Sequence, residues 1–230
     1  MKKITLLLCY LLCCGCTASP TPQVSQAEKN QARPLTDSSV GDNTLSGKIA
    51  AEEAIVFVVR LNGNHKEYIN RCIFNECTSV LIRAVQRLRN DQKFAVLIPQ
   101  SSGGYIYLPT TDNLGIPRRH GSESLASGIH VKGQTSVDLL DLKPWFGESN
   151  DVRTVELVEQ LLAPRREGVV VYVTDDVFAD LQPLTKLRSS GLSVLCYFVR
   201  VSDKVSRADE RAFSRETAKA GINVLWSDWP

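Results

Sequence analysis

The sequence predicts an α/β or α+β fold in which an N-terminal half rich in β-hairpins precedes a mostly parallel β-α-β-α-β half. In the second half, continuous apolar strands alternate with helix-forming segments, which is typical of a parallel sheet buried between helices. In the first half, short β-prone runs are separated by turn-forming segments at 62–63 and 101–104, and such segments favour hairpins.

The first half begins with a strongly β-prone run over 54–59. We expect it to form a hairpin with a mixed segment through Tyr68 and Ile69, because Asn-Gly is the strongest short hairpin signal. A helix is predicted from about Thr78, where apolar residues recur every three or four positions. A second hairpin is expected from 94–99 and 105–108, followed by one or two strands within 128–142.

The second half alternates regularly. The apolar patterns predict helices over 151–162, 177–188 and 206–220, and strands over 169–174, 194–201 and 222–226. Pro183 inside the middle helix indicates a kink or a late start. Gly191 and Gly221 follow two of these helices, as expected of residues that end a helix.

The first residues have the order of a secretory signal peptide. Lys2 and Lys3 form a charged start, an apolar run covers 4–14, and Gly15 precedes Cys16. The apolar run is too short to span a bilayer, which takes about twenty residues. We therefore expect residues 1–15 to be a leader that is removed during export.

Residues 1–16 resemble the leader of bacterial lipoproteins, whose lipobox is a Leu, two small residues and an invariant Cys. Gly15 and Cys16 match this pattern, Cys14 is small, and Cys13 stands where Leu is usual. The resemblance implies cleavage before Cys16, a diacylglyceryl thioether on its sulfur and acylation of its amino group. Several fatty chains on one residue give stable attachment to a membrane.

A polar segment follows the lipobox. Residues 16–48 contain several Pro, Ser, Thr and Gln residues and no aromatic residue, so we expect a solvated tether that spans roughly 30 Å as a coil. The body is then predicted to be one periplasmic domain over 49–230, with halves at 49–147 and 148–230.

The residues after Cys16 also bear on the membrane. In enteric lipoproteins, an Asp directly after the acylated Cys is the signal for staying in the inner membrane. Here Thr17 and Ala18 follow, and the first acidic residue is Glu28. The resemblance therefore implies a lipid-anchored protein of the outer membrane that faces the periplasm.

Three cysteines belong to the body. Cys72 and Cys77 are close in sequence, and we expect a disulfide between them in an oxidising periplasm. Two free thiols, or a metal site that uses the nearby His65, are the alternatives. Cys196 lies within an apolar strand and is expected to be a small buried hydrophobe.

Acidic residues follow the predicted strands of the second half. Asp175 and Asp176 come directly after 169–174, and Asp203 and Asp228 follow the next two strands. Carboxyl ends of parallel strands meet at one edge of a sheet, so these carboxylates form a candidate rim for a divalent metal. The simpler interpretation is that Asp175 or Asp176 caps the next helix.

Charge and motifs narrow the function. The chain has 27 basic and 25 acidic side chains, and without Lys2 and Lys3 the numbers are equal. This balance argues against a nucleic-acid partner, and no motif predicts catalysis or a cofactor. We expect a binding or scaffold component of a membrane-associated assembly, such as a secretion or conjugation apparatus, with other envelope proteins as partners. The alternatives are an exported metal-dependent hydrolase that uses Asp175 and Asp176, and a small-ligand carrier.

Overall fold

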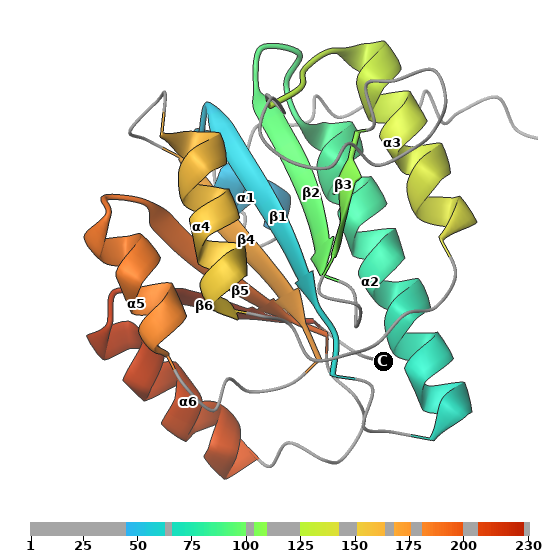
Figure 1. Ribbon diagram of the computed structural model, residues 1–230. Coiled ribbons are helices and arrows are strands. Elements are labelled where there is room, and N and C mark those ends of the chain that lie inside the picture. Colours follow the sequence, from blue (N-terminus) through green and yellow to red (C-terminus); the bar gives the residue numbers. More distant parts are fainter. Residues whose placement is uncertain are drawn as a thin grey trace, which may run out of the picture. The chain divides into compact units, whose positions relative to one another are not determined.

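The computed structural model describes residues 45–62, 66–99, 104–109, 125–142, 151–163, 168–175, 181–199 and 207–227. Within these residues the strands form one six-stranded sheet in the order β3-β2-β1-β4-β5-β6 (Figure 1). The strands are β1 Ala54–Arg60, β2 Lys93–Pro99, β3 Tyr105–Leu108, β4 Val169–Thr174, β5 Ser193–Phe198 and β6 Asn223–Trp226.

The sheet is parallel except at one edge. β3 runs antiparallel to β2, as the second predicted hairpin requires, and pairs Val96 with Leu108 and Pro99 with Tyr105. All other neighbouring strands are parallel. β1 lies between β2 and β4, so the strands of 49–147 and 148–230 belong to one sheet. The predicted α/β fold with a mostly parallel sheet is confirmed.

Helices cover both faces of the sheet. Alternate side chains of β1 belong to two separate hydrophobic clusters, because successive residues of a strand point to opposite faces. One face packs against α1 Leu45–Ile49, α2 Glu67–Arg87 and α3 Ile129–Asp141. The other face packs against α4 Asp151–Leu162, α5 Gln182–Ser189 and α6 Arg207–Lys219 (Figure 1).

The first predicted hairpin is wrong. β1 pairs with β2 and β4 rather than with the segment through Ile69, and that segment is the start of α2. α2 therefore begins at Glu67, not near Thr78, and runs for 21 residues. Because β1 is buried on both faces, it needs parallel neighbours and a helical crossover rather than a tight turn. Gly63 of the expected turn lies outside the described residues.

The strands predicted within 128–142 are also wrong, because this segment forms α3. Its buried residues include Lys132, Thr135 and Ser136, while Val137 and Leu140 are exposed. The helix therefore lacks the inward apolar pattern by which a helix is recognised in a sequence.

The second half follows the prediction closely. α4, β4, β5, α6 and β6 all lie where the apolar patterns placed them. α5 begins late, at Gln182, with Pro183 in its first turn, where the missing N–H does no harm. Gly191 and Gly221 follow α5 and α6 with φ of 89° and 69°, a conformation that favours glycine.

The body begins earlier in the chain than expected. Leu45 and Ile49 of α1 are buried in the core, so the end of the segment predicted as tether is helical. The buried Gln92 amide holds this helix, because its Nε2 donates to the carbonyl oxygens of Ile49 at 2.9 Å and of Glu52 at 2.6 Å. The chain divides into units 1–38 and 39–230, and the described residues all belong to the second.

No helix within the described ranges is both long enough and apolar enough to cross a membrane.

Candidate functional site

The order of the strands reverses between β1 and β4, so their carboxyl ends form the topological switch point of the sheet. From β1 the chain crosses to β2 on one side, and it later returns to place β4 on the other side of β1. The helices after these strands, α2 and α5, cover opposite faces of the sheet. In open α/β sheets, ligands bind at such a switch point, at the carboxyl ends of the strands. The switch point is therefore the first candidate site.

Asp175 lies at this switch point. It follows the last residue of β4, and only 6% of its surface is exposed. Its Oδ1 accepts a hydrogen bond of 2.8 Å from the backbone N–H of Asn62, which follows β1. Asp175 therefore joins the ends of the two strands that flank the switch point.

The expectation that Asp175 or Asp176 caps the next helix stays a prediction, because residues 176–180 lie outside the described residues. The N-cap of α5 as described is Leu181, and it makes no side-chain capping hydrogen bond. The Asp175 carboxylate satisfies a backbone donor directly after the neighbouring strand β1. Asp176, the other candidate cap, lies outside the described residues.

Cys77 of α2 is close enough to Asp175 to respond to its charge. Burial raises the pKa of the Cys77 thiol well above its ordinary value, and the negative charge of Asp175 raises it further. The thiol is therefore protonated at neutral pH. Because the thiolate is the reactive form of cysteine, Cys77 is no nucleophile in this fold.

A group of polar residues lies where the switch point meets α4, and we call it the α4 polar cluster. Its members are Arg60, Tyr105, Asp151, Thr154 and Tyr172. The Arg60 guanidinium pairs with the Asp151 carboxylate at 3.5 Å, and the hydroxyls of Tyr105 and Thr154 are 3.0 Å apart. Burial, and then the charge of Asp151, raises the pKa of Tyr172. Burial is also the main cause that raises the pKa of Tyr105.

Sequence reasoning missed this cluster. Arg60 ends β1 and Asp151 begins α4, so the two residues are 91 positions apart. Each of the two residues lies at the end of a predicted strand or helix, and charged residues at such ends are candidates for a site at the edge of the sheet. Only the order of the strands, however, brings these ends to one edge of the sheet.

The predicted acidic rim is only partly described. Of its four members, Asp175 lies at the switch point, whereas Asp176, Asp203 and Asp228 lie outside the described residues. Within the described part of the chain, no three His, Cys, Asp or Glu side chains gather as metal ligands would. Of the four predicted rim carboxylates, the described residues therefore include Asp175 alone.

The cysteines differ from the expectation. Cys72 is exposed, Cys77 is buried, and both are free thiols on α2. Five residues on a helix that turns about 100° per residue place side chains on different sides, so the predicted Cys72–Cys77 disulfide is not formed. Cys196 is buried on β5 as predicted, and burial raises its pKa to about 12. Cys16 and His65 lie outside the described residues.

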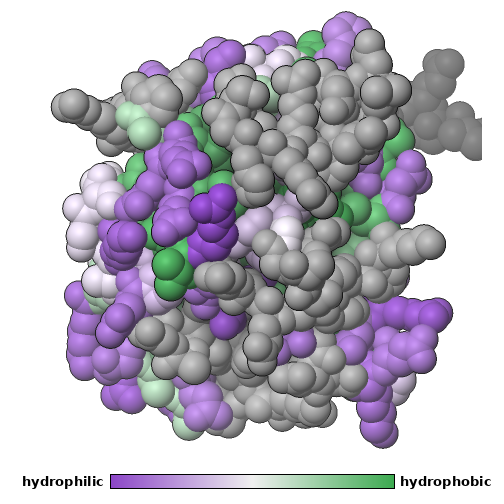
Figure 2. Space-filling model, viewed as in Figure 1, coloured by the Kyte–Doolittle hydropathy of each residue, from purple (hydrophilic) through white to green (hydrophobic). Residues whose placement is uncertain are grey.

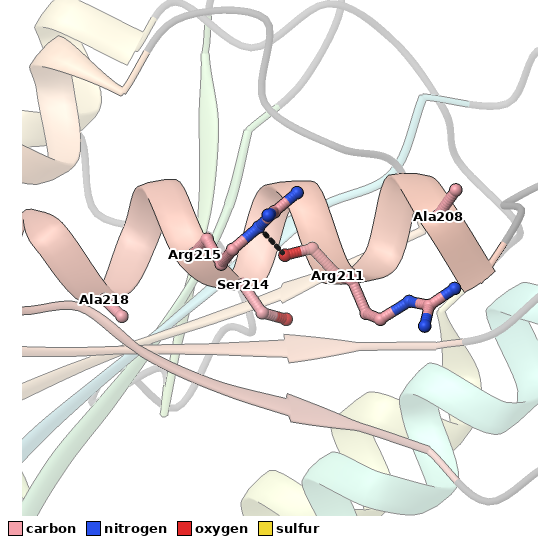
Figure 3. A pocket seen from close by; sticks show the side chains of 5 residues that line it. All are labelled: Ala208, Arg211, Ser214, Arg215 and Ala218. Atoms are coloured by element: carbon pink, nitrogen blue, oxygen red, sulfur yellow. Dashed lines mark hydrogen bonds between the residues drawn. The ribbon is translucent and has the colours of Figure 1, made fainter.

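A shallow groove of about 590 Å³ lies along α6. Figure 3 shows its lining side chains, which all come from this helix: Ala208, Arg211, Ser214, Arg215 and Ala218. Arg215 Nε donates to the backbone oxygen of Arg211 at 3.3 Å. Two of the described lining side chains, Arg211 and Arg215, are positively charged, which favours an anionic group in the groove. Figure 2 shows that the described surface on the side of α4, α5 and α6 is mostly hydrophilic.

Comparison with known proteins supports the fold and nothing finer. No family model and no curated protein matches this chain. The solved structure of a von Willebrand factor type A protein from Catenulispora acidiphila aligns with a TM-score of 0.52 and 13% identity, over 78% of this chain and 39% of that one. This chain thus spans well under half the length of that protein.

A second solved structure, the manganese-loaded TRAP protein of Plasmodium vivax, aligns with a TM-score of 0.48 and 14% identity, over 77% of this chain and 69% of that one. At these identities the likeness concerns the arrangement of strands and helices alone.

Proposed function

We propose that this chain is a membrane-anchored envelope lipoprotein that acts as a binding or scaffold component of a membrane-associated assembly, such as a secretion or conjugation apparatus. The observation that carries the proposal is the leader, in which Lys2 and Lys3, the apolar run 4–14 and Gly15 precede Cys16. Acylation of Cys16 would hold the body at a membrane by a tether of about thirty residues, a reach of roughly 30 Å.

The chemistry of the residues at the switch point supports binding over catalysis. Asp175 accepts a backbone hydrogen bond, and Arg60 is paired with Asp151. Burial raises the pKa of both Cys77 and Tyr172, so these groups stay neutral at physiological pH. General acid–base catalysis favours a group whose pKa lies near the working pH, and these groups are far from it.

Acyl-chain labelling tests the anchor. Cys16→Ala should abolish the incorporation of labelled palmitate and the appearance of the cleaved form, because the acylated sulfur is lost. Cys14→Ala is the matched control and should keep both. If the Cys16→Ala protein still incorporates palmitate, the proposed anchor is wrong.

We propose the outer membrane as the location, with the body in the periplasm, because no acidic residue directly follows Cys16. After separation of the two membranes on a sucrose gradient, the protein should be found in the outer-membrane fractions. In a host that follows the enteric rule, Thr17→Asp should move it to the inner membrane. A wild-type protein found only in the inner membrane would contradict this assignment.

Isolation in mild detergent tests the scaffold role. The wild-type protein should elute with other envelope proteins in a stable complex, and Cys16→Ala should lose most of that complex because the body no longer stays at the membrane. If the wild type elutes only as free protein, without any other envelope component, the scaffold role fails while the anchor stands.

One observation favours a second candidate, an exported metal-dependent hydrolase: Asp175 places a carboxylate at the carboxyl ends of β1 and β4. A thermal melt with and without Mg²⁺ separates the two candidates. The binding proposal expects no change in Tm. Stabilisation of the wild type that disappears in Asp175→Asn, but persists in Asp141→Asn on the exposed end of α3, would favour the hydrolase.

A further inference from the structure

α3 exposes its apolar residues and buries its polar ones. Three large aliphatic side chains on its outer side are at least half exposed: Ile129 at 66%, Val137 at 51% and Leu140 at 69%. Gly133 lies among them on the same side, because residues four apart are neighbours on a helix. We call these four residues the α3 stripe. The buried residues of the helix are Lys132, Thr135, Ser136 and Leu139.

The buried polar residues of α3 have partners. The Lys132 ammonium donates to the backbone oxygen of Leu88 at 2.7 Å and to Asn90 Oδ1 at 3.0 Å, which attaches α3 to the end of α2. The Thr135 and Ser136 hydroxyls donate to backbone oxygens of α3 itself. The polar groups on the inner face of α3 therefore have hydrogen-bond partners. The residues of the α3 stripe take no part in these bonds.

Gly133 has no role inside the described body. A Cβ atom at this position would meet no atom within 4 Å, and its φ is not in the left-handed range. Glycine in a helix interior is less stable than alanine by roughly 0.5–1 kcal/mol. Its advantage is that another backbone can approach closely, and here that approach is open only from outside the helix.

We propose that the α3 stripe is the contact surface of a symmetric dimer, in which α3 packs antiparallel against α3 of a second copy of this chain. A two-fold axis near the middle of the helix places Val137 of each copy over Gly133 of the other. The side chain of one residue thus fills the space that the other leaves open. Such self-complementarity is what an interface between identical surfaces requires.

The charges beside the α3 stripe select the same arrangement. His130 lies near the start of α3 and Asp141 at its end, and both are exposed. Antiparallel packing brings the His130 imidazole, which carries an N–H donor, next to the Asp141 carboxylate of the second copy. Parallel packing would instead keep both His130 side chains at one end of the helix pair and both Asp141 side chains at the other, so the two residues would not meet.

The helix is short, and this limits the strength of the contact. Thirteen residues give a helix of about 20 Å. One helix face buries less than the roughly 1,000 Å² of a stable interface. We therefore expect a reversible dimer. This proposal does not depend on the lipid anchor.

Thiol crosslinking of the full chain in mild detergent tests the geometry. In a Cys72→Ser background, which removes the exposed native thiol, Val137→Cys should give a covalent dimer with a short bis-maleimide, because cysteine is close to valine in size and Gly133 stays unchanged. Val152→Cys is the matched control, because Val152 is an exposed aliphatic residue of α4 that is 66% accessible and outside the α3 stripe. It should remain monomeric, and Leu140→Lys added to Val137→Cys should abolish the dimer.

Two results of this experiment would overturn the proposal: equal dimer yields from Val137→Cys and Val152→Cys, or no dimer from Val137→Cys. Crosslinking of Val137→Cys only to a different envelope protein would also refute a second copy as the occupant.

Gly133→Ala separates the proposed contact from a structural role, since the two predict opposite effects. Alanine should raise the Tm of the monomer because it favours the helix. It should also weaken dimerisation by about fivefold, because its methyl group occupies the space for Val137 of the second copy. Sedimentation equilibrium measures the second effect. A dissociation constant unchanged in Gly133→Ala would refute the proposed packing.

Discussion

α3 and α4 cover opposite faces of the same sheet, and they are held there by different forces. α4 buries an aliphatic row of Val155, Val158 and Leu162 against the strands. α3 buries a single aliphatic residue, Leu139, and is attached by hydrogen bonds from Lys132. Burial of each large aliphatic side chain stabilises a fold by about 1.5–3 kcal/mol. α4 is therefore held mainly by its buried apolar surface, whereas α3 is held mainly by hydrogen bonds.

This difference explains why α3 can present apolar residues to the outside. A helix that is held by buried apolar surface must turn its apolar face towards the sheet, as α4 does. A helix that is held by hydrogen bonds on its inner face does not need apolar residues there. Its apolar residues can therefore lie on the outer face and contact another molecule. The contrast therefore supports a contact role for the α3 stripe.

The largest expected effect concerns α4. Leu162 is 1% exposed, and its Cδ2 lies 3.0 Å from where a Cβ of Gly168 would be, so it is tightly packed. Leu162→Ala should lower the free energy of unfolding by about 3 kcal/mol through lost burial and a residual cavity. Chemical denaturation measures this, with Val152→Ala as the exposed control on the same helix. A decrease in the free energy of unfolding of less than about 1 kcal/mol would show that buried apolar surface does not hold α4 in place.

The next effect breaks the polar attachment of α3. Lys132→Met keeps the length of the side chain but removes both hydrogen bonds and leaves the Leu88 oxygen at the end of α2 without its donor. We expect a loss of about 2 kcal/mol in the free energy of unfolding, the usual range for hydrogen bonds to charged groups. Lys186→Met, at an exposed lysine of α5, should change stability by less than about 0.5 kcal/mol. If Lys132→Met and Lys186→Met lower the free energy of unfolding equally, the hydrogen bonds of Lys132 do not hold α3 in place.

The same contrast determines what the sequence could predict. In α4 and the strands of the second half, apolar spacing and burial coincide, so the pattern gave the elements almost residue by residue. In α3 the apolar residues point outward and Lys132 points inward, so the same pattern led to predicted strands. At α2, the Asn62-Gly63 turn signal outweighed the weaker helical spacing of the residues that follow.

The candidate site was predictable only in part. Asp175 was identified from its position after a strand, because that position lies at the rim of any parallel sheet. Its bond to the Asn62 N–H, and the pair of Arg60 with Asp151, require β1 to lie beside β4. Nothing in the local sequence specifies the order of strands that are all equally apolar.

A third prediction tests whether both helical layers exclude water equally. Each layer buries one cysteine, Cys77 on the side of α2 and Cys196 on β5 facing the other layer. In the native protein at pH 8, an alkylating reagent should modify Cys72 and spare the other two. Mass spectrometry should find all three modified after unfolding. Rapid reaction of one buried thiol would show that its layer opens more readily than the other.

The pH dependence of stability sharpens that test. Burial raises the pKa of Cys196 from 9.0 to about 12, so the unfolded chain loses this proton first as the pH rises. The stabilising contribution is complete below pH 9 and is lost progressively towards pH 12. Between pH 9 and 10, the free energy of unfolding should fall by about 1 kcal/mol more in the wild type than in Cys196→Val. Parallel curves for the two proteins in urea titrations would contradict a buried, protonated thiol.

The smallest expected effect lies on the α3 stripe and involves two adjacent leucines. Leu139 is 1% exposed and Leu140 is 69% exposed. Leu140→Gln should change the free energy of unfolding by less than about 0.5 kcal/mol, because the side chain has no packing to lose within one copy. The measurement must be made at a protein concentration low enough to keep the chain monomeric, since dimerisation adds apparent stability. The same substitution should abolish the crosslinked dimer. A stability loss above about 1 kcal/mol in the monomer would mean that the chain itself covers Leu140, and the α3 stripe would then be part of the core rather than a contact surface.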